Sequence, residues 1–440
     1  MPDRDDLLRG AGEVAAAVRE GWPEGAAGRS GPQGVADRTD ALAATGPSME
    51  TLLLQALGDD AFAGVSPAIH QTSLFTFDSF EQMRSTLDGR EYRYVYTRGR
   101  NPTVEAFERM IALLEGADEA VAFASGMAAI SAVLLGTVRS GDRIVCVRNV
   151  YPDAHRLMTQ LLPRFGVGVE FVDGTDTAAA LEAVAGAGTP ARLLYLESPT
   201  SQLFELQDLE PLAAEARRLG TLTVLDNSWA TPLGQRPLSA GVDLVIHSAS
   251  KYLSGHSDVV AGVVAGSSAL IERLRRSELM MLGGKLSPLE AWLLVRGVRT
   301  LPIRLERHAR SALEVAGFLE SSPHVKAVNY PGLESHPQHD LFRRYFRHGS
   351  GVLSFELEDE RMVEPFVDAL ELFSLGVSWG GYESLVYPSL LGHLTGDEAG
   401  FTRYFGVPRA LVRLHVGLED PADLIADLTQ AFSVATKGGT

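Results

Sequence analysis

Short apolar runs recur through the middle of the chain. They are continuous rather than alternating, and they cover residues 120–124, 143–147, 167–172, 193–196, 222–225, 242–246 and 259–265. Helical segments such as 209–219 separate most of them. Strands that are apolar throughout and are joined by helices are typical of a mostly parallel sheet with helices on both faces. The pattern therefore predicts an α/β fold for this part of the chain.

Helix boundaries are visible on both sides of the first run. Before it, apolar residues repeat at helical spacing and Gly116 ends the helix; the repeat is Val104, Phe107, Ile111 and Leu114. After it, residues 125–127 (Ser-Gly-Met) open an Ala-rich helix. A helix that starts directly after a strand presents its free N–H groups at the edge of the sheet, where an anion can bind.

The pattern changes after Gly297. Residues 304–319 have the pattern of one long helix, 351–357 and 411–418 of strands, and 424–432 of a closing helix. We assign the large domain to residues 104–299 and a smaller C-terminal α+β domain to residues 300–440. Residues 1–50 are rich in Ala, Gly, Asp and Arg, so a loosely ordered extension with one helical candidate at 7–20 is expected there.

Composition narrows the possible functions. The 440 residues are 45% hydrophobic and 22% charged, which excludes a wholly disordered or fibrous chain. The formal net charge of −17 argues against binding nucleic acid or an anionic membrane through a net field. The single cysteine, Cys146, excludes an internal disulfide, and its apolar neighbours favour a buried, inert side chain.

The expected location is the cytoplasm. The first residues, MPDRDD, lack the basic and apolar regions of a secretory signal. No stretch reaches the ~18 consecutive apolar residues that a membrane-spanning helix requires. We therefore expect small-molecule chemistry, with no membrane partner, no nucleic acid and no metal.

Reactive side chains follow the predicted strands. Ligands bind beyond the carboxyl ends of the strands in open parallel sheets. That edge would collect a helix start at 125–127, an aromatic ring, two carboxylates, two hydroxyls and a lysine, namely Tyr151, Glu197, Asp226, Ser248, Ser250 and Lys251. Lys251 lies between two apolar strands, and a desolvated lysine has a lowered pKa and can form a Schiff base.

Pyridoxal 5'-phosphate (PLP) is a cofactor whose requirements this set of residues meets. PLP needs a lysine for the imine, an acid beside the ring nitrogen, an anion site for the phosphate and a flat surface for the ring. Lys251 supplies the amine for the imine, Asp226 the acid beside the ring nitrogen and Tyr151 the flat surface; the anion site is the third requirement. The helix start at 125–127, with Ser248 and Ser250, supplies the third. Each residue alone has an ordinary structural explanation, so the combination carries the prediction.

Six motifs give the chain a family resemblance. They are YTRGRNPT at 96–103, ASGMAA at 124–129, DNSWATP at 226–232, HSASKYLSGHSD at 247–258, RGVRTLP at 296–302 and VRLHVGLED at 412–420. Over roughly residues 64–435 the chain resembles the Cys/Met-metabolism PLP-dependent enzymes, which include cystathionine γ-synthase and the cystathionine β- and γ-lyases. The resemblance implies a fold type I PLP-dependent transferase-like architecture. It also implies that residues 51–103 form an arm that contacts a neighbouring subunit.

The resemblance assigns roles to matching residues. Lys251 would be the Schiff-base lysine, Asp226 the partner of the pyridine nitrogen, and Tyr151 the ring that stacks on PLP. The phosphate would be bound by Gly126, Met127, Ser248 and Ser250, and by Tyr96 and Arg98 of a neighbouring subunit. The active unit would then be a homodimer, with a tetramer expected. The catalytic set would be Lys251, Tyr151, Tyr96 and Asp226. Arg413 would bind the substrate carboxylate with help from Ser378, and Glu197 would also face the substrate.

Some positions depart from the family pattern. Ser201 stands where many members have an Asn near the cofactor ring. The resemblance places Ser201 among the cofactor-binding residues, although a serine departs from the residue type that tunes the cofactor there. Trp379 follows Ser378 as in bacterial cystathionine β-lyases, whereas residues 101–103 and 300–302 look like the γ-synthase and γ-lyase branch. Methionine γ-lyases typically carry a Cys just after the stacking Tyr, but Pro152 and Asp153 follow Tyr151. That difference argues against this member.

The resemblance predicts a lyase of transsulfuration, in methionine and cysteine metabolism. It would act on a cystathionine-like amino acid by β- or γ-elimination, through a Lys251 aldimine and a quinonoid. A γ-replacement synthase or sulfhydrylase acting on an O-acylhomoserine, and γ-elimination on a nonproteinogenic amino acid, remain open alternatives. A Ser-x-x-Lys acyl hydrolase with Ser248 as nucleophile is a remote alternative, because its companion motifs do not occur. A non-catalytic PLP-fold protein, and a zinc enzyme using His336 and His339, are further remote alternatives.

Overall fold

The computed structural model describes residues 48–55, 64–394 and 398–437. Apart from residues 48–50, the extension expected at 1–50 lies outside the described residues, and so does its helical candidate at 7–20. Two sheets organise the described chain, with seven strands in the first and five in the second. They occupy the halves that the sequence assigns to the large and small domains, although the domain boundaries themselves stay a prediction.

The large sheet has the strand order β1-β7-β6-β5-β4-β2-β3. The strands are β1 (Glu119–Phe123), β2 (Arg143–Val147), β3 (Gly168–Val172), β4 (Leu193–Glu197), β5 (Leu222–Asp226), β6 (Leu244–Ser248) and β7 (Gly262–Gly266). Strands β6, β5, β4, β2 and β3 pair in parallel, which confirms the mostly parallel sheet. Strand β7 is antiparallel to β1 and β6, because the loop between β6 and β7 returns without a crossover helix.

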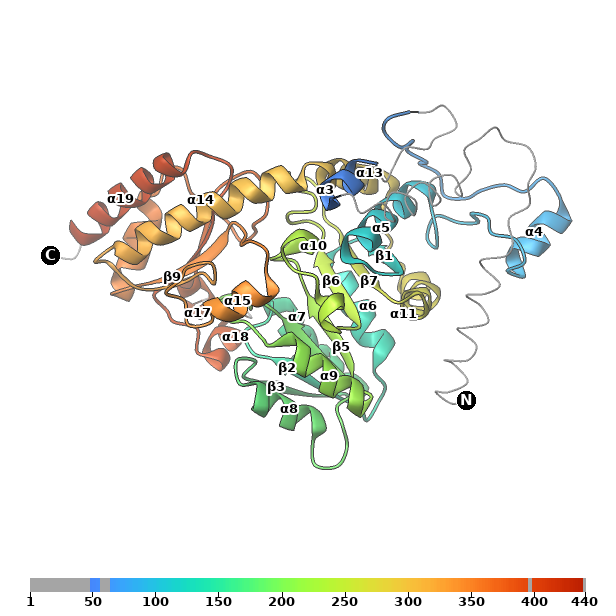
Figure 1. The fold of residues 1–440 in the computed structure, drawn as a ribbon, viewed down its shortest axis with the longest axis horizontal. Helices are drawn as coiled ribbons and strands as arrows, with labels where there is room; N and C mark the ends of the chain where they lie inside the picture. Colours follow the sequence, from blue (N-terminus) through green and yellow to red (C-terminus); the bar gives the residue numbers. More distant parts are fainter. Residues whose placement is uncertain (1–47, 56–63, 395–397, 438–440) are drawn as a thin grey trace.

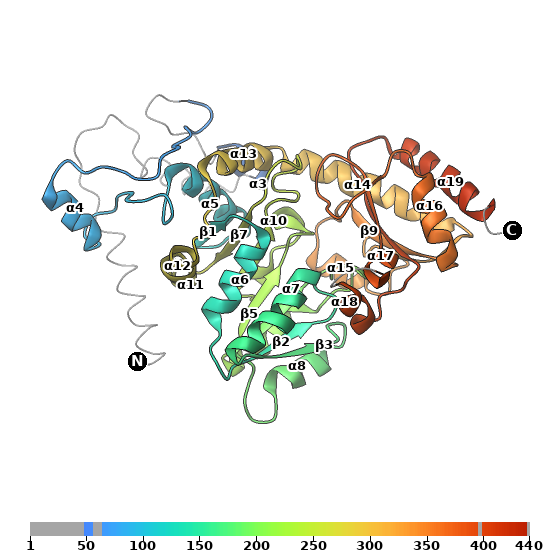
Figure 2. The ribbon, with the colours of Figure 1, turned by 180° about the vertical axis from the view of Figure 1, so that it is seen from behind.

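Helices cover both faces of this sheet. Helix α9 (Leu209–Leu219) lies in front of it in Figure 1, and α6 (Gly126–Thr137) and α7 (Pro152–Arg156) lie in front of it in the reverse view of Figure 2. The remaining helices of this half are α5 (Pro102–Glu115), α8 (Thr177–Ala185), α10 (Thr231–Gly234), α11 (Ser268–Leu274), α12 (Met280–Leu282) and α13 (Pro288–Arg299). Short 3-10 or π turns are η1 (Leu157–Leu161), η2 (Leu162–Phe165), η3 (Pro237–Ala240) and η4 (Arg275–Leu279).

Local sequence sets the helix ends. Asn101 caps α5 by accepting the Thr103 N–H at 3.0 Å, and Pro102 occupies the first helical position. Gly116 ends the helix with φ 69°, a left-handed backbone that glycine adopts without strain. The helix buries Phe107, Ile111 and Leu114 as the sequence predicts.

The smaller sheet has the order β10-β11-β12-β9-β8. The strands are β8 (Val325–Asn329), β9 (Val352–Leu357), β10 (Ser374–Leu375), β11 (Leu385–Pro388) and β12 (Leu411–His415). The helices are α14 (Leu301–Ser321), α15 (His339–Tyr345), α16 (Val363–Ala369), α17 (Ser389–Leu394), α18 (Glu398–Phe405) and α19 (Pro421–Lys437), with a 3-10 turn η5 (Glu360–Met362). Strand β12 ends at His415 rather than at 418, because the Leu418 N–H turns to the Tyr382 carbonyl at 2.8 Å.

An extended arm precedes the large sheet. Helix α3 (Met49–Gln55) and helix α4 (Phe80–Leu87) are the regular elements described between residues 48 and 101. Helix α3 packs beside α5 and α13, whereas the arm over residues 64–101, with α4, extends away from the large sheet in both views (Figures 1 and 2). Several of its apolar side chains are exposed, including Leu74, Phe80 and Leu87. In the described part of the chain, no helix has the length and apolar character to cross a membrane.

Candidate active site

The Lys251 amine lies where the two halves of the chain meet. Lys251 follows β6 in the large half, and its Nζ donates to the Ser378 Oγ of the smaller half at 2.7 Å. Nζ also lies 5.2 Å from the centre of the Trp379 ring. Burial and, after it, the charge of Arg413 lower the pKa of Lys251 to about 8, while Asp226 acts in the opposite direction. The structure thus places a partly neutral amine at the carboxyl edge of the sheet.

Asp226 ends β5 and is held in place by Ser228. The Ser228 N–H and hydroxyl donate to Asp226 Oδ1 at 3.0 and 2.6 Å. The same hydroxyl accepts the Ser248 N–H at 2.7 Å and so joins the ends of β5 and β6. Burial raises the pKa of Asp226, although the Ser228 hydrogen bonds act against that shift. Ser228 is not among the site residues predicted from the sequence; a hydroxyl two residues after an Asp is the signal that could have found it.

The start of α6 packs closely against Ser248. Ser125 caps the helix by accepting the Ala128 N–H at 3.0 Å. A Cβ on Gly126 would lie 3.0 Å from the Ser248 Oγ, so only glycine lets the helix start approach that serine. The N–H groups of the first turn, at Gly126 and Met127, have no partner within a helix and suit an anion.

Ser250 is less open than Ser248. Its hydroxyl accepts the Ala261 N–H at 2.9 Å and donates to the Ala261 carbonyl at 3.2 Å. The hydroxyl thereby secures the loop that returns to β7. Phosphate binding by Ser250 stays a prediction.

Tyr151 lies just before α7, with both its ends hydrogen-bonded. Its backbone N–H donates to Glu197 Oε2 at 2.7 Å, and its phenol donates to Asp153 Oδ2 at 3.0 Å. Arg156 holds the other oxygen of Asp153 at 2.9 Å. The ring is 41% exposed and so offers a face to a ligand. Asp153 departs from the family pattern, and its contact with the phenol was not predicted from the sequence.

Glu197 and Ser201 have structural partners. Glu197 is buried, and burial followed by the charge of Asp226, its register partner, raises its pKa well above the usual range. Its carboxylate orients the Tyr151 backbone. Ser201 donates its N–H to the Asn149 carbonyl at 2.8 Å, in the turn before Tyr151. Substrate binding by Glu197 and cofactor binding by Ser201 stay predictions.

Arg413 lies in β12 and is directed toward the Lys251 side of the sheet. Its guanidinium donates to the Val377 carbonyl at 2.9 Å, directly before Ser378, and its Cζ lies 5.2 Å from the centre of the Tyr387 ring. These contacts place a buried cation beside the lysine whose pKa it lowers. A guanidinium fits a carboxylate through two parallel hydrogen bonds.

Tyr96 and Arg98 lie outside this cluster. Both are exposed on the arm, and the Arg98 Cζ lies 5.4 Å from the centre of the Tyr96 ring. The structure therefore brings together Lys251, Asp226, Ser378 and Arg413. Ser248 ends β6 just before Lys251, and Tyr151 follows β2 at the same edge of the sheet. The structure does not bring Tyr96 or Arg98 into the same group within one chain.

The clustered residues fit PLP. Asp226 is held through Oδ1, and within the described chain no hydrogen bond reaches its Oδ2, which leaves a partly buried anion for a cationic ring nitrogen. Gly126 has no side chain between the first N–H groups of α6 and Ser248, and such N–H groups suit a phosphate. Lys251 supplies a desolvated amine for the aldehyde. In the described ranges, no group of three or more His, Cys, Asp or Glu side chains is placed to hold a metal ion.

Comparison with known proteins gives a consistent result. The family model described as "Cys/Met metabolism PLP-dependent enzyme" matches residues 50–433. An L-methionine γ-lyase of Pseudomonas putida is 40% identical over 375 residues, which cover 84% of this chain and 92% of that protein. A cystathionine γ-lyase of Bacillus subtilis is 38% identical, over 85% of this chain and 96% of that protein.

A solved structure is also similar. It comes from Campylobacter jejuni and is described as an O-acetylhomoserine (thiol)-lyase that carries an N'-pyridoxyl-lysine-5'-monophosphate. The TM-score is 0.83 at 31% sequence identity, and the match covers 88% of this chain and 100% of that one. Similarity to methionine γ-lyases is thus as high as to cystathionine lyases, and the departure after Tyr151 does not by itself separate this chain from them.

Proposed function

The chain belongs to the Cys/Met metabolism PLP-dependent enzyme family, and we propose that it eliminates a leaving group from the β or γ carbon of cystathionine or a related sulfur amino acid. It is a PLP-dependent enzyme with a fold type I architecture. The observation that carries the proposal is a lysine with a pKa of about 8, hydrogen-bonded to Ser378 and placed between Asp226 and Arg413.

The residues that would hold PLP follow from the site. Lys251 would hold the aldehyde, Asp226 the ring nitrogen and Tyr151 a face of the ring, while the first turn of α6 and Ser248 would hold the phosphate. When bound, PLP supplies a carbonyl carbon for the substrate amine and a protonated ring that accepts electron density from the substrate Cα.

Lys251 performs the proton transfers. Because its pKa lies near 8, a minor but accessible fraction of the amine is neutral at physiological pH and can take the proton from the substrate Cα. The Ser378 Oγ accepts a hydrogen bond from Nζ and so fixes the direction in which the amine points. For a leaving group at Cγ, a second proton must move at Cβ, and the same amine is placed to move it.

Arg413 and Tyr151 orient the substrate and its leaving group. Arg413 pairs with the α-carboxylate and holds the Cα–H bond toward Lys251. The Tyr151 phenol, which donates to Asp153 in the free protein, would turn its proton from that carboxylate to a departing sulfur atom. Elimination then needs no second nucleophile in the site.

The exposed arm supports a homo-oligomer with shared sites. Tyr96 and Arg98 are solvent-facing in one chain and lie apart from its own cluster, so the proposal assigns them to a site on another copy. A dimer is the smallest unit that would complete a site, and a tetramer is expected. The cytoplasm is the expected location.

Product analysis tests the proposed reaction. The holoenzyme would be incubated with cystathionine, methionine, homocysteine and an O-acylhomoserine, with and without an added thiol. Release of a keto acid and ammonia without a thiol supports elimination. Formation of a new thioether, dependent on the thiol, would instead favour γ-replacement, which the likeness to the Campylobacter protein makes the second candidate.

Two lysine variants provide the control. Lys251→Ala should abolish turnover, whereas Lys326→Ala, at an exposed lysine paired with Glu356, should leave it unchanged. Native turnover by Lys251→Ala protein would contradict the proposal.

A further inference from the structure

The arm presents Tyr96 and Arg98 on a tight turn. Tyr96 bridges Leu74 in antiparallel fashion, and the N–H groups of Gly99 and Arg100 both donate to the Tyr96 carbonyl, at 3.0 and 3.3 Å. Tyr96 is 45% exposed, and Arg98 is exposed beside it. Because the turn itself is open to solvent, its shape depends on the contacts made by the residues directly before and after it.

Before the turn, two tyrosines converge on one carboxylate. The phenols of Tyr92 and Tyr94 donate to Glu105 Oε2 at 3.0 and 2.5 Å. Arg109 donates to the other oxygen, Oε1, at 2.6 Å. Glu105 lies on α5 and is buried; burial opposes its ionisation, but Arg109 and Tyr94 outweigh burial and lower its pKa. Glu105 therefore stays ionised and binds both tyrosines.

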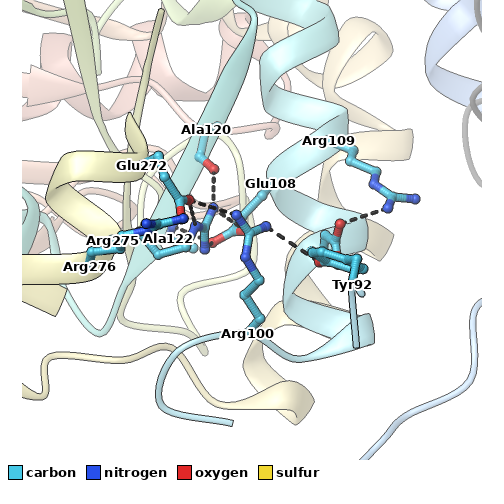
Figure 3. A network of polar contacts seen from close by, with 10 residues as sticks. Tyr92, Arg100, Glu108, Arg109, Ala120, Ala122, Glu272, Arg275 and Arg276 are labelled. Atoms are coloured by element: carbon cyan, nitrogen blue, oxygen red, sulfur yellow. Dashed lines mark hydrogen bonds and ion pairs between the residues drawn. The ribbon is translucent and has the colours of Figure 1, made fainter. Parts of the chain in front are cut away.

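After the turn, an arginine reaches across to α11. Arg100 donates to Glu272 Oε2 at 2.7 Å, and Arg276 holds the other oxygen at 2.6 Å. Next to this pair, Arg275 makes two hydrogen bonds to the buried Glu108, at 3.0 and 3.1 Å. Figure 3 shows these ion pairs side by side, with Arg100 between Glu272 and Tyr92.

The network thus joins the arm to the body of its own subunit at two points. One point precedes the turn and depends on Glu105, and the other follows it and depends on Glu272. Glu105 is 11% exposed, and Arg100 and Glu272 are 25% and 28% exposed. Partly buried ion pairs of this kind hold a geometry better than exposed ones do, because breaking them leaves an unpaired charge. The side chains between the two points are then preorganised before any partner binds.

We propose that Glu105 and Glu272 are positioning residues that hold the turn carrying Tyr96 and Arg98 in the shape that a neighbouring subunit's active site uses. This inference rests on the proposed function, in which that turn completes the partner's phosphate site. Neither glutamate touches the partner's cofactor in this proposal. Each acts through the backbone of residues 94–100.

Mixed oligomers test the inference. Two differently tagged chains are co-expressed and the mixed species is isolated. The first chain carries Lys251→Ala, so its own site is inactive but its arm is intact. The second carries Arg98→Ala, so its arm is impaired but its lysine is intact. One site of the pair then has a lysine and a complete partner arm, and the mixture should recover activity that neither chain shows alone.

Glu105→Gln is then placed in either chain of the pair. In the first chain it alters the arm that serves the working site, and the PLP affinity of that site should fall by about tenfold. In the second chain it alters only the arm that serves the inactive site, and the PLP affinity should be unchanged. Affinity is read from the absorbance of lysine-bound PLP, which only the Lys251-containing site produces.

Tyr94→Phe, which removes one hydroxyl, repeats the comparison if Glu105→Gln folds poorly. Glu91→Gln on the exposed arm is the control.

The possible outcomes are distinct. If the mixed oligomer recovers no activity, the shared-site part of the proposed function is wrong. If it recovers activity but Glu105→Gln or Tyr94→Phe lowers PLP affinity equally in either chain, the network has a general folding role and the inference is overturned. A loss confined to the chain that lends its arm supports positioning.

Discussion

At the scale of single residues, opposing charges act on the Lys251 amine. Arg413 adds to the effect of burial and lowers the lysine pKa, whereas Asp226 raises it. Together these effects leave the pKa of Lys251 at about 8, well below that of a solvated lysine. A fraction of the Lys251 amine is therefore neutral near physiological pH and can act as a nucleophile without an additional base.

The pH dependence of PLP capture checks this balance. When PLP is mixed with apoenzyme, the neutral Lys251 amine reacts, so the rate should rise with pH through about 8 and then level off. Arg413→Leu removes a positive charge and should move the midpoint upward. Rapid-mixing absorbance across pH measures both curves. A midpoint near that of an ordinary lysine in the unaltered protein would contradict the assignment.

Ser228 supports a second residue-scale prediction. Ser228→Ala removes the hydroxyl that donates to Asp226 and leaves the Ser248 N–H without its acceptor. A buried unsatisfied donor costs about 1–3 kcal/mol. We expect a lower unfolding free energy of that size together with weaker PLP binding. Ser228→Thr keeps the hydroxyl and should restore both, as urea unfolding and PLP titration can show; a Thr variant as weak as Ala would count against the hydrogen-bond explanation.

At the scale of elements, the sequence predicts those helices and strands that have a regular apolar pattern or a clear capping residue of their own. Helix α9 has the predicted bounds, and α6 begins after the predicted Ser125 cap. Strand β8 was not predicted, because its residues are partly exposed and it lacks a continuous apolar run. The reversed direction of β7 also escapes the pattern, since an apolar run does not encode which way it pairs.

The start of α6 gives a prediction about an element. Gly126→Ala would place a Cβ 3.0–3.3 Å from Ser248 atoms, so the helix start and β6 must separate slightly. We expect PLP affinity to fall by roughly tenfold or more, because small misplacements of a binding group are costly. The control is Gly317→Ala in α14, where a Cβ meets nothing within 4 Å. That change should raise stability by up to about 1 kcal/mol without affecting PLP binding.

At the scale of the whole molecule, the active site depends on contacts that no local pattern contains. Ser378 lies 127 residues from Lys251 in the sequence, yet its hydroxyl fixes the amine. Family motifs supply the identity of both residues, but only the packing of the small sheet against the large one shows that they touch. The contact between Tyr151 and Asp153 differs, because it is local and was missed only since Asp153 departs from the family pattern.

Helix α4 carries the last prediction, which concerns assembly. Phe80, Met83 and Leu87 are spaced along one stripe of this helix, and they are 82%, 43% and 62% exposed in the single chain. An exposed apolar stripe on an extended arm is typical of a subunit interface. In the proposed oligomer, burying it against a neighbour would also bring Tyr96 and Arg98 to the neighbour's site.

The double variant Phe80→Ser, Met83→Ser should therefore weaken assembly without unfolding the chain, because neither side chain is part of a core. Sedimentation should show smaller species on dilution, and PLP affinity should fall in parallel with dissociation. Glu81→Ala, at an exposed residue of the same helix paired with Arg84, should change neither property. If the double variant forms an oligomer of unaltered size, the apolar stripe of α4 is not the interface. Another surface would then have to bring Tyr96 and Arg98 to the neighbouring site.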